Sequence, residues 1–322
     1  MTYARIAGIG SFLPEKVLTN KDLEGMMDTS DEWIRERTGI KRRHIAAQDE
    51  TTASMALEAA RRALEMADTD PSEIDLIVVG TCTPDKVIPS VACIVQRRLG
   101  IKGCGALDVN AACSGFVYGL DIASRYMRTG GAQKALVIGA ETLSRITNWQ
   151  DRTTAVLFGD GAGAVVLEAS DEPGILATHI HANGEYEDLL HTQNGVSLGF
   201  DASCEPGAYI EMNGNAVFKR AVGTFDAMAR ETIADLDGHL DDIDCFIPHQ
   251  ANMRIITAAA KKLGMPMERV IATVDEHANT SGASIPLALD LAVRDGRIKR
   301  GDTLLMAAFG AGFTWGSAML RY

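Results

Sequence analysis

One cysteine of this chain has the surroundings of a nucleophile. Cys113 stands in the segment Ala111-Ala112-Cys113-Ser114-Gly115, after an expected strand and at the start of an expected helix. The unpaired N–H groups and the dipole of a helix start favour a thiolate, and the small neighbours leave room for a substrate. By position alone, an inert buried thiol is an equally good interpretation.

Two residues far along the chain could assist such a cysteine. His249 follows the apolar run that ends at Pro248, and α/β folds place their sites at strand ends. Asn279 begins a segment of sequence Asn-Thr-Ser-Gly, where the plain interpretation is a helix N-cap. Each of the two residues alone is weak evidence of a site.

The remaining cysteines and histidines are assigned structural roles. No two cysteines have C-x-x-C spacing, which argues against a zinc site. His179 and His181 share one face of an expected strand, but the sequence shows no third ligand, so no metal site is expected. The other residues of this group are Cys82, Cys93, Cys104, Cys204, Cys245, His44, His191, His239 and His277.

An internal repeat links the candidate residues. Residues 73–78 resemble residues 242–247, and residues 110–123 resemble residues 279–292; the differences 243 − 74 and 279 − 110 both equal 169. Two matches at one offset indicate a duplicated unit. If the halves pack as a pseudo-dimer, both helix starts and the strand end at His249 can face one pocket.

Strands and helices alternate in both halves, which predicts an α/β fold with mostly parallel sheets. The expected strands are 75–80, 105–109, 135–139 and 303–308, and the expected helices are 54–67, one ending at 130–131 and one between 279 and 296. Glycine-rich segments at 8–10, 159–163 and 310–316 lack the following helix of a dinucleotide loop. They are interpreted as tight turns between strands, and a backbone N–H of the last could face a substrate oxygen.

The composition limits the class of protein. The chain has 322 residues and a formal net charge of −12, so it is too long for one ordinary core and a poor candidate for nonspecific nucleic-acid binding. It has no run of 18 apolar residues and no signal-peptide pattern at its start. We therefore expect two tightly packed halves, no membrane span and a cytoplasmic location.

Seven segments in order resemble the β-ketoacyl-acyl-carrier-protein synthase III family of the thiolase-like superfamily, and they extend over essentially the whole chain. They are 29–34 (TSDEWI), 37–40 (RTGI), 111–113 (AAC), 158–163 (FGDGAG), 248–252 (PHQAN), 279–281 (NTS) and 312–316 (GFTWG). The resemblance implies an α/β thiolase-like fold of duplicated βαβαβ-type halves, 1–170 and 171–322. These halves would pack as a pseudo-dimer in α-β-α-β-α layers.

The resemblance implies a catalytic triad of Cys113, His249 and Asn279. Cys113 would take an acetyl group from acetyl-CoA; malonyl-ACP would then lose CO₂ and attack it, giving acetoacetyl-ACP and starting fatty acid synthesis. His249 and Asn279 suit the enolate formed by decarboxylation, because both are neutral donors. The oxyanion of acyl transfer would meet the backbone N–H groups of Cys113 and Gly310. No metal or cofactor is implied, since the CoA thioester is a substrate.

The resemblance also assigns residues to the two acyl carriers. The adenine of CoA would lie between Trp33 and Arg152, because an aromatic ring and a guanidinium can sandwich a base. Thr29, Arg37 and Asn252 would lie nearby. An acidic acyl carrier protein would meet a basic helix face formed by Lys219, Arg254, Lys261 and Lys262. Surface anchoring and a solvated face are the plain alternatives for these groups.

Ile88 bears on the choice of primer. It lies in the proline-rich loop 83–90, where the apolar pair Val87-Ile88 should be buried by something. In the family, this loop reaches across a homodimer and its apolar residue forms the floor of the partner's acyl pocket. Because isoleucine stands where acetyl-preferring relatives carry phenylalanine, we expect a deeper pocket that accepts acetyl, propionyl and butyryl primers.

Three other functions fit parts of this pattern. A related synthase could make a polyketide or a signalling molecule from another acyl-CoA with the same triad. A cysteine hydrolase would need a G-x-C-x-G elbow, and position 111 is alanine. A non-catalytic acyl-CoA-binding protein would not need all three triad residues. A stable acetyl adduct would favour a synthase, turnover without an adduct a hydrolase, and neither a binding protein.

Overall fold

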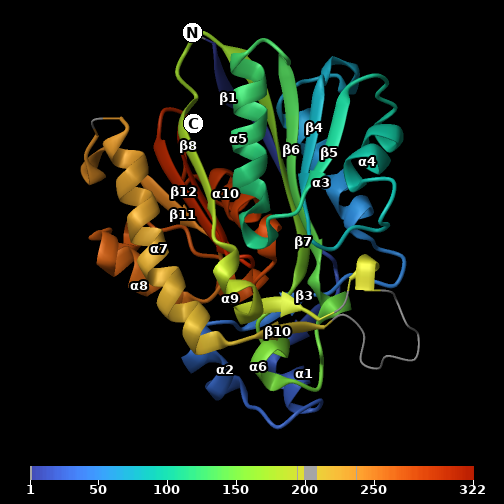
Figure 1. The fold of residues 1–322 in the computed structure, drawn as a ribbon, viewed down its shortest axis with the longest axis vertical. Helices are drawn as coiled ribbons and strands as arrows, with labels where there is room; N and C mark the ends of the chain where they lie inside the picture. Colours follow the sequence, from blue (N-terminus) through green and yellow to red (C-terminus); the bar gives the residue numbers. More distant parts are fainter. Residues whose placement is uncertain (1, 194, 199–208, 237) are drawn as a thin grey trace.

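The computed structural model describes residues 2–193, 195–198, 209–236 and 238–322 and builds them around two sheets with helices between and outside them (Figure 1). Cys204, which we expected to be structural, lies outside the described residues. None of the described helices combines the length and the apolar character that crossing a bilayer requires.

The first sheet has five strands in the order β1-β7-β6-β4-β5. Strands β6, β4 and β5 pair in parallel, whereas β7 pairs antiparallel with both β6 and β1, so β1 runs in the same direction as β6. β4 is apolar and buried along its whole length, as a strand covered on both faces must be. The strands are β1 (Tyr3–Phe12), β4 (Leu76–Gly80), β5 (Gly105–Val109), β6 (Lys134–Thr142) and β7 (Asp160–Ser170).

The second sheet has four strands in the order β11-β12-β13-β8, in which β11 and β12 pair in parallel and β13 pairs antiparallel with both β12 and β8. The strands are β8 (Ile175–Ala182), β11 (Cys245–Pro248), β12 (Thr303–Gly310) and β13 (Thr314–Arg321). Four of the seven strand pairings in these two sheets are antiparallel, so the expectation of mostly parallel sheets is wrong for the pairing, although only β7 and β13 run against the other strands of their sheets. The connection from β12 to β13 has three residues, and so short a turn joins only antiparallel strands.

Helices complete a five-layered arrangement, which is visible edge-on in Figure 1. One outer layer covers the first sheet, a central pair of helices lies between the sheets, and the other outer layer covers the second sheet. In that order the layers hold α3 (Thr52–Met66) and α4 (Val91–Leu99), then α5 (Gly115–Arg128) and α10 (Ser284–Arg294), then α7 (Gly214–Ala234) and α8 (Met253–Leu263).

The duplication predicted from the sequence is confirmed by the positions of the elements. The starts of β4 and β11, of β6 and β12, and of α5 and α10 each differ by 169, since 245 − 76, 303 − 134 and 284 − 115 give that number. One buried apolar cluster extends from Ala4 to Tyr322 and joins both halves. The division into residues 1–170 and 171–322 stays a prediction.

Glycine–glycine contacts seat the two central helices directly against the strand ends. A Cβ on Gly80, at the end of β4, would collide with the backbone of Gly115 at the start of α5. A Cβ on Gly139 in β6 would likewise collide with Gly282, just before α10. These contacts hold the segments that carry Cys113 and Asn279 close to the carboxyl ends of the strands.

Two of the three glycine-rich segments are not turns. Gly8 and Gly10 lie inside β1, where a Cβ would collide with the backbone of α3, and Gly161 and Gly163 lie inside β7 beneath α10. In these strands glycine permits close packing of a helix, so the prediction of turns was wrong there. The segment after Gly310 does form the expected turn between β12 and β13.

Short helices and strands fill the lower part of the view in Figure 1, below the two large sheets. They are α1 (Asn20–Glu24), α2 (Asp31–Thr38), α6 (Arg152–Ala155), α9 (Val274–His277), β2 (Val17–Thr19), β3 (Arg42–His44), β9 (Leu190–Thr192) and β10 (Ile210–Met212).

Candidate active site

Cys113 lies on a single turn of 3₁₀ helix, Ala112–Ser114, between β5 and α5. Ala112 has a positive φ of 46°, which is rare for alanine and turns the chain sharply just before the cysteine. The backbone at the end of β12 presses against this turn, since a Cβ on Gly310 would lie 2.7 Å from the Cys113 nitrogen. The structure therefore brings together the two backbone segments expected to bind an oxyanion.

Burial raises the pKa of the Cys113 thiol to about 12. The hydroxyl of Ser281 lowers this pKa, and the negative charge of Glu141 raises it further. The expectation that the helix start favours a thiolate is therefore wrong for the resting protein. Loss of solvent around the sulfur outweighs the helix start, and Cys113 rests as a neutral thiol.

His249 is buried at the end of β11 and is also neutral at pH 7. Burial lowers the pKa of its imidazole to about 3. Nδ1 lies 2.7 Å from Oγ of Ser284, which also accepts a hydrogen bond of 3.3 Å from the Gln250 N–H. This arrangement leaves the Ser284 hydroxyl proton free for Nδ1, which favours the tautomer with its hydrogen on Nε2.

The side-chain amide of Asn279 is oriented by the backbone after it. Its Oδ1 accepts a hydrogen bond of 2.9 Å from the Ser281 N–H. The backbone N–H of Asn279 donates to the Leu157 carbonyl, and the backbone carbonyl of Asn279 accepts from the Gly159 N–H. Because Oδ1 is occupied, Nδ2 is the group left to donate into the pocket. Asn279 is thus an oriented donor that closes a local turn onto Ser281, and the plain interpretation of a helix N-cap is wrong, because Thr280 holds the N-cap position of the following 3₁₀ turn.

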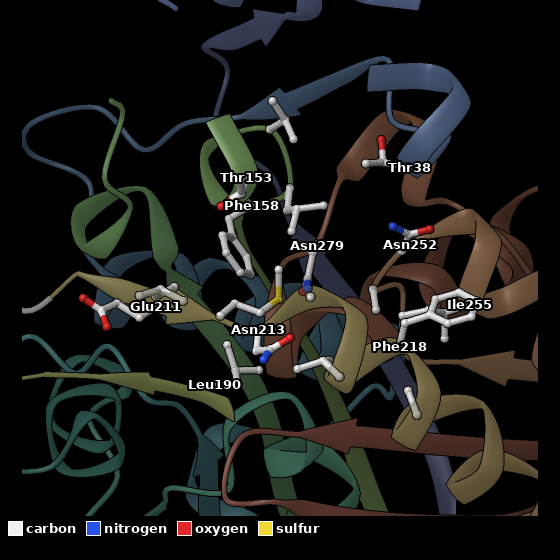
Figure 2. Close-up of a pocket in the computed structure, with 18 of the residues that line it drawn as sticks. Thr38, Thr153, Phe158, Leu190, Glu211, Asn213, Phe218, Asn252, Ile255 and Asn279 are labelled. Carbon is white, nitrogen blue, oxygen red and sulfur yellow. The ribbon is translucent and has the colours of Figure 1, made fainter. Parts of the chain in front are cut away.

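A cavity of about 1010 Å³ joins these groups, and Cys113, His249 and Asn279 all line it. Asn279, Phe158 and Asn213 converge on it from three separate segments, in the close-up of Figure 2. The walls combine buried apolar side chains with a few amide and hydroxyl groups, as small-molecule sites usually do. This volume suits an acyl chain together with part of its carrier.

The residues assigned to CoA lie at one side of this cavity. Trp33, Arg37 and Asn252 line it, and Asn252 caps α8 by accepting from the Arg254 N–H. The guanidinium carbons of Arg37 and Arg152 lie 4.9 and 5.1 Å from the centre of the Trp33 ring. These distances are direct cation–π contacts, so no space for a base is open between Trp33 and Arg152.

Thr29, also assigned to CoA, does not line the cavity. Its hydroxyl oxygen is buried and has no hydrogen-bond partner among the described residues. The structure therefore gives no support for a contact between Thr29 and a ligand in the cavity.

The four basic residues assigned to the carrier protein are exposed on two helices that pack together, α7 and α8. Arg254 also lines the cavity, and its guanidinium lies 5.5 Å from the Phe218 ring of α7. Lys261 and Lys262 lie two turns farther along α8 than Arg254. Lys219 lies on α7 one residue after Phe218 and does not itself line the cavity.

Ile88 does not line the cavity of its own chain. In the single chain, 83% of Ile88 and 62% of Val87 are exposed, so the expected burial is not provided by the chain itself. The loop lies next to strand β5, because the Asp108 carboxylate of β5 accepts from the N–H groups of Val91 and Ala92.

Sequence reasoning missed Glu141 and Ser281. The carboxylate of Glu141 is fully buried and accepts hydrogen bonds from Thr83, from the backbone of Cys82 and from the Ser281 hydroxyl. Burial raises the pKa of Glu141 despite these bonds. An acidic residue at the end of the apolar run 135–140 was the available signal.

The structure supplies a third candidate metal ligand for His179 and His181 that the sequence did not show. Glu231 of α7 lies opposite both, and one ligand atom from each of the three residues falls within 4.8 Å of the others. The third ligand is 50 residues away in the sequence, which is why the strand pattern did not reveal it.

Comparison with known proteins links the site to one family. Residues 107–184 match the family described as 3-oxoacyl-[acyl-carrier-protein (ACP)] synthase III, and residues 233–322 match the C-terminal part of that family. The β-ketoacyl-[acyl-carrier-protein] synthase III of Thioalkalivibrio sulfidiphilus is 62% identical over 322 residues, which is the full length of both chains.

Solved structures agree with this relationship. The 3-oxoacyl-[acyl-carrier-protein] synthase III of Aquifex aeolicus VF5 superposes with a TM-score of 0.94 at 49% identity, covering 99% of this chain and 100% of that chain. The priming β-ketosynthase of the R1128 polyketide pathway also gives a TM-score of 0.94, at 38% identity, covering 99% of this chain and 96% of that chain.

Proposed function

This chain belongs to the 3-oxoacyl-[acyl-carrier-protein] synthase III family of condensing acyltransferases, which begin fatty acid synthesis, and we propose that its primer is acetyl-CoA and its second substrate malonyl-ACP. Its five-layered architecture is the thiolase-like fold expected from the sequence. The observation that carries the proposal is the meeting of Cys113, His249 and Asn279 in one cavity.

In the first half-reaction, Cys113 sulfur attacks the thioester carbon of acetyl-CoA, the bond to the CoA sulfur breaks, and the acetyl group stays on Cys113. The starting groups are a thiol with a pKa of about 12 and a neutral imidazole with a pKa of about 3. A neutral imidazole can take the thiol proton during the attack and give it to the departing sulfur, provided that its nitrogen facing the thiol is bare. For this step the hydrogen must therefore move to Nδ1, with the Ser284 hydroxyl turned to accept it, and it must return to Nε2 for the second half-reaction. We therefore assign His249 to this step, whereas Asn279 is not needed in it.

In the second half-reaction, malonyl-ACP loses CO₂ and negative charge develops on its thioester oxygen. The Asn279 Nδ2 amide and the His249 Nε2–H can donate to that oxygen. The enolate carbon then attacks the acetyl carbon, the bond to Cys113 breaks, and its sulfur takes up a proton. The fixed amide of Asn279 and the Ser284 contact of His249 support this assignment.

CoA would enter past Trp33 and Arg37. For the adenine to lie between Trp33 and Arg152, Arg152 must turn away from the ring, which breaks its 2.9 Å hydrogen bond to the Asp28 carbonyl. An acyl carrier protein would dock on the basic residues of α7 and α8. Its acidic surface would be attracted to them even though the whole chain carries a net charge of −12.

A second copy of the chain would cover the exposed apolar loop. Strand β5 is an edge strand of its sheet, and the loop with Val87 and Ile88 lies beside it. An unpaired edge next to exposed apolar side chains favours pairing with another copy. The homodimer, the placing of Ile88 in the partner's acyl pocket, and the cytoplasmic location stay predictions.

Intact-protein mass spectrometry after mixing with acetyl-CoA, followed by CO₂ release from malonyl-ACP, tests the proposal. We expect one acetyl group on Cys113 and its transfer to malonyl-ACP. Rate measurements should include propionyl-, butyryl- and longer acyl-CoA primers. If a longer primer gives the highest kcat/KM, acetyl-CoA is not the preferred substrate, and the condensing function itself would stand.

A further inference from the structure

A cluster of two histidines and two carboxylates lies away from the catalytic cavity. His179 and His181 occupy alternate positions of β8 and so point to the same face of the sheet. Glu231 of α7 and Asp235, the residue that ends this helix, are four apart and lie on one helix face. The four side chains meet where the helix crosses the strand.

The distances between these side chains approach those around one metal ion. His181 Nε2 lies 2.9 Å from one carboxylate oxygen of Glu231, and His179 Nδ1 lies 3.7 Å from the other. Ligand atoms bound to one tetrahedral zinc ion lie roughly 3.3 Å apart, given bonds of about 2.0–2.2 Å. Small side-chain movements would therefore bring all three ligand atoms onto one ion.

The Nε2 atom of His179 lies beside the Asp235 carboxylate, which could support metal binding at Nδ1. Nε2 is buried without a well-aligned hydrogen bond, although it lies 3.1 Å from an Asp235 oxygen. Once Nδ1 binds a metal, the hydrogen must be on Nε2, which can then donate to Asp235. Such a carboxylate behind a ligating histidine is the usual support of a metal site. His181 is held in place by stacking on Trp315 at 5.6 Å.

The charges around the cluster also favour a cation. Among the described residues, Glu231 and Asp235 form ion pairs only with the two histidines. Two arginines of α5 line the same hollow as His179 and Asp235, but Arg125 is paired with Asp121 and Arg128 donates to the carbonyls of residues 175 and 176. Two carboxylates therefore face two imidazoles, and no lysine or arginine among the described residues pairs with either carboxylate.

From this geometry we propose that His179, His181 and Glu231 bind one divalent transition-metal ion of the zinc class, with Asp235 supporting His179. Three protein ligands leave one position open to water. The ion joins the last turns of α7 to β8, while Val217 and Phe218 at the other end of α7 line the catalytic cavity. Metal binding thus stiffens the helix that forms one cavity wall.

Isothermal titration of the full-length protein with zinc chloride tests this site. The protein is first stripped of metal with a chelator. It carries Cys113→Ser, so that the active-site thiol cannot bind zinc together with His249. We expect one zinc per chain. His181→Asn and Glu231→Gln should each abolish this binding, and Asp235→Asn should weaken it by about 10–100-fold. His239→Asn, at an exposed position, should change nothing.

Thermal unfolding of each variant with and without zinc provides a second readout. Zinc should raise the Tm of the parent protein and of His239→Asn, but not that of His181→Asn or Glu231→Gln. Each variant is compared with itself, so a loss of intrinsic stability does not affect the conclusion. The absence of stoichiometric zinc binding by the parent would overturn the proposal, and so would stoichiometric binding that survives both substitutions.

Discussion

Replacing Asn279 by alanine separates its chemical role from its structural one. The substitution removes the Nδ2 donor assigned to the enolate oxygen, and the loss of one such donor lowers a rate by about 10²–10³. The decarboxylation of malonyl-ACP should fall by this factor. Acetylation of Cys113 by acetyl-CoA should change little, because its oxyanion is assigned to the backbone N–H groups of Cys113 and Gly310.

The same substitution has a separate effect on stability. It leaves the Ser281 N–H without its 2.9 Å partner, and a buried unpaired donor costs about 1–3 kcal/mol of unfolding free energy. Thr51→Ala is the matched control: it removes the cap of α3 in the outer layer, with a stability loss of about 1 kcal/mol and no expected change in either half-reaction.

The measurements are CO₂ release from malonyl-ACP, acetyl incorporation by intact mass, and chemical denaturation of each variant. His249→Ala completes the set, because it should impair both half-reactions if the neutral imidazole carries the thiol proton. Decarboxylation at the normal rate in Asn279→Ala, with stability lowered as calculated, would refute the reasoning. Asn279 would then serve only to fix the local turn at Ser281.

Four further predictions follow from the charges and exposures of individual residues. Iodoacetamide should alkylate Cys113 faster at each step from about pH 7 to about pH 10, because the pKa of its thiol is about 12; a plateau near pH 8 would indicate a stabilised thiolate. The unfolding free energy should fall as the pH drops below about 6.5, because two histidines become protonated in the unfolded chain but stay neutral in the fold, His249 down to about pH 3 and His277 down to about pH 4. His277→Gln should reduce the slope of unfolding free energy against pH by about 1.4 kcal/mol per pH unit, and an unchanged slope would contradict the low pKa of His277. Arg254→Glu should raise the KM for malonyl-ACP, less so at high salt, and leave acetylation intact. Lys299→Glu, just before β12 at the end of that strand away from the cavity, should leave the KM unchanged, and equal effects of Arg254→Glu on both substrates would argue against a carrier contact. Ile88→Phe should lower the ratio of kcat/KM for butyryl-CoA to kcat/KM for acetyl-CoA, and Ile88→Ala should raise this ratio, because each methylene in such a pocket is worth about 1–3 kcal/mol. A constant ratio would exclude Ile88 from the acyl pocket.

The sequence by itself determined the repeat and the residues at its equivalent positions. The offset of 169 recurs in β4 and β11 because two similar segments bury similar faces and so fold into similar units. The motifs around Cys113, His249 and Asn279 likewise identified the family, because a nucleophile, a base and a donor at helix starts and strand ends leave a readable local pattern.

Only the tertiary structure decided properties that depend on many distant neighbours. The pKa of Cys113 is set by how completely both halves exclude water from its sulfur, and a helix start in the sequence carries no information on that. Gly10 and Gly163 looked like turn residues until helix packing showed why a side chain has no room there. Glu231 meets His179 and His181 because α7 crosses β8, and no spacing along the chain records a contact that the packing of two elements creates.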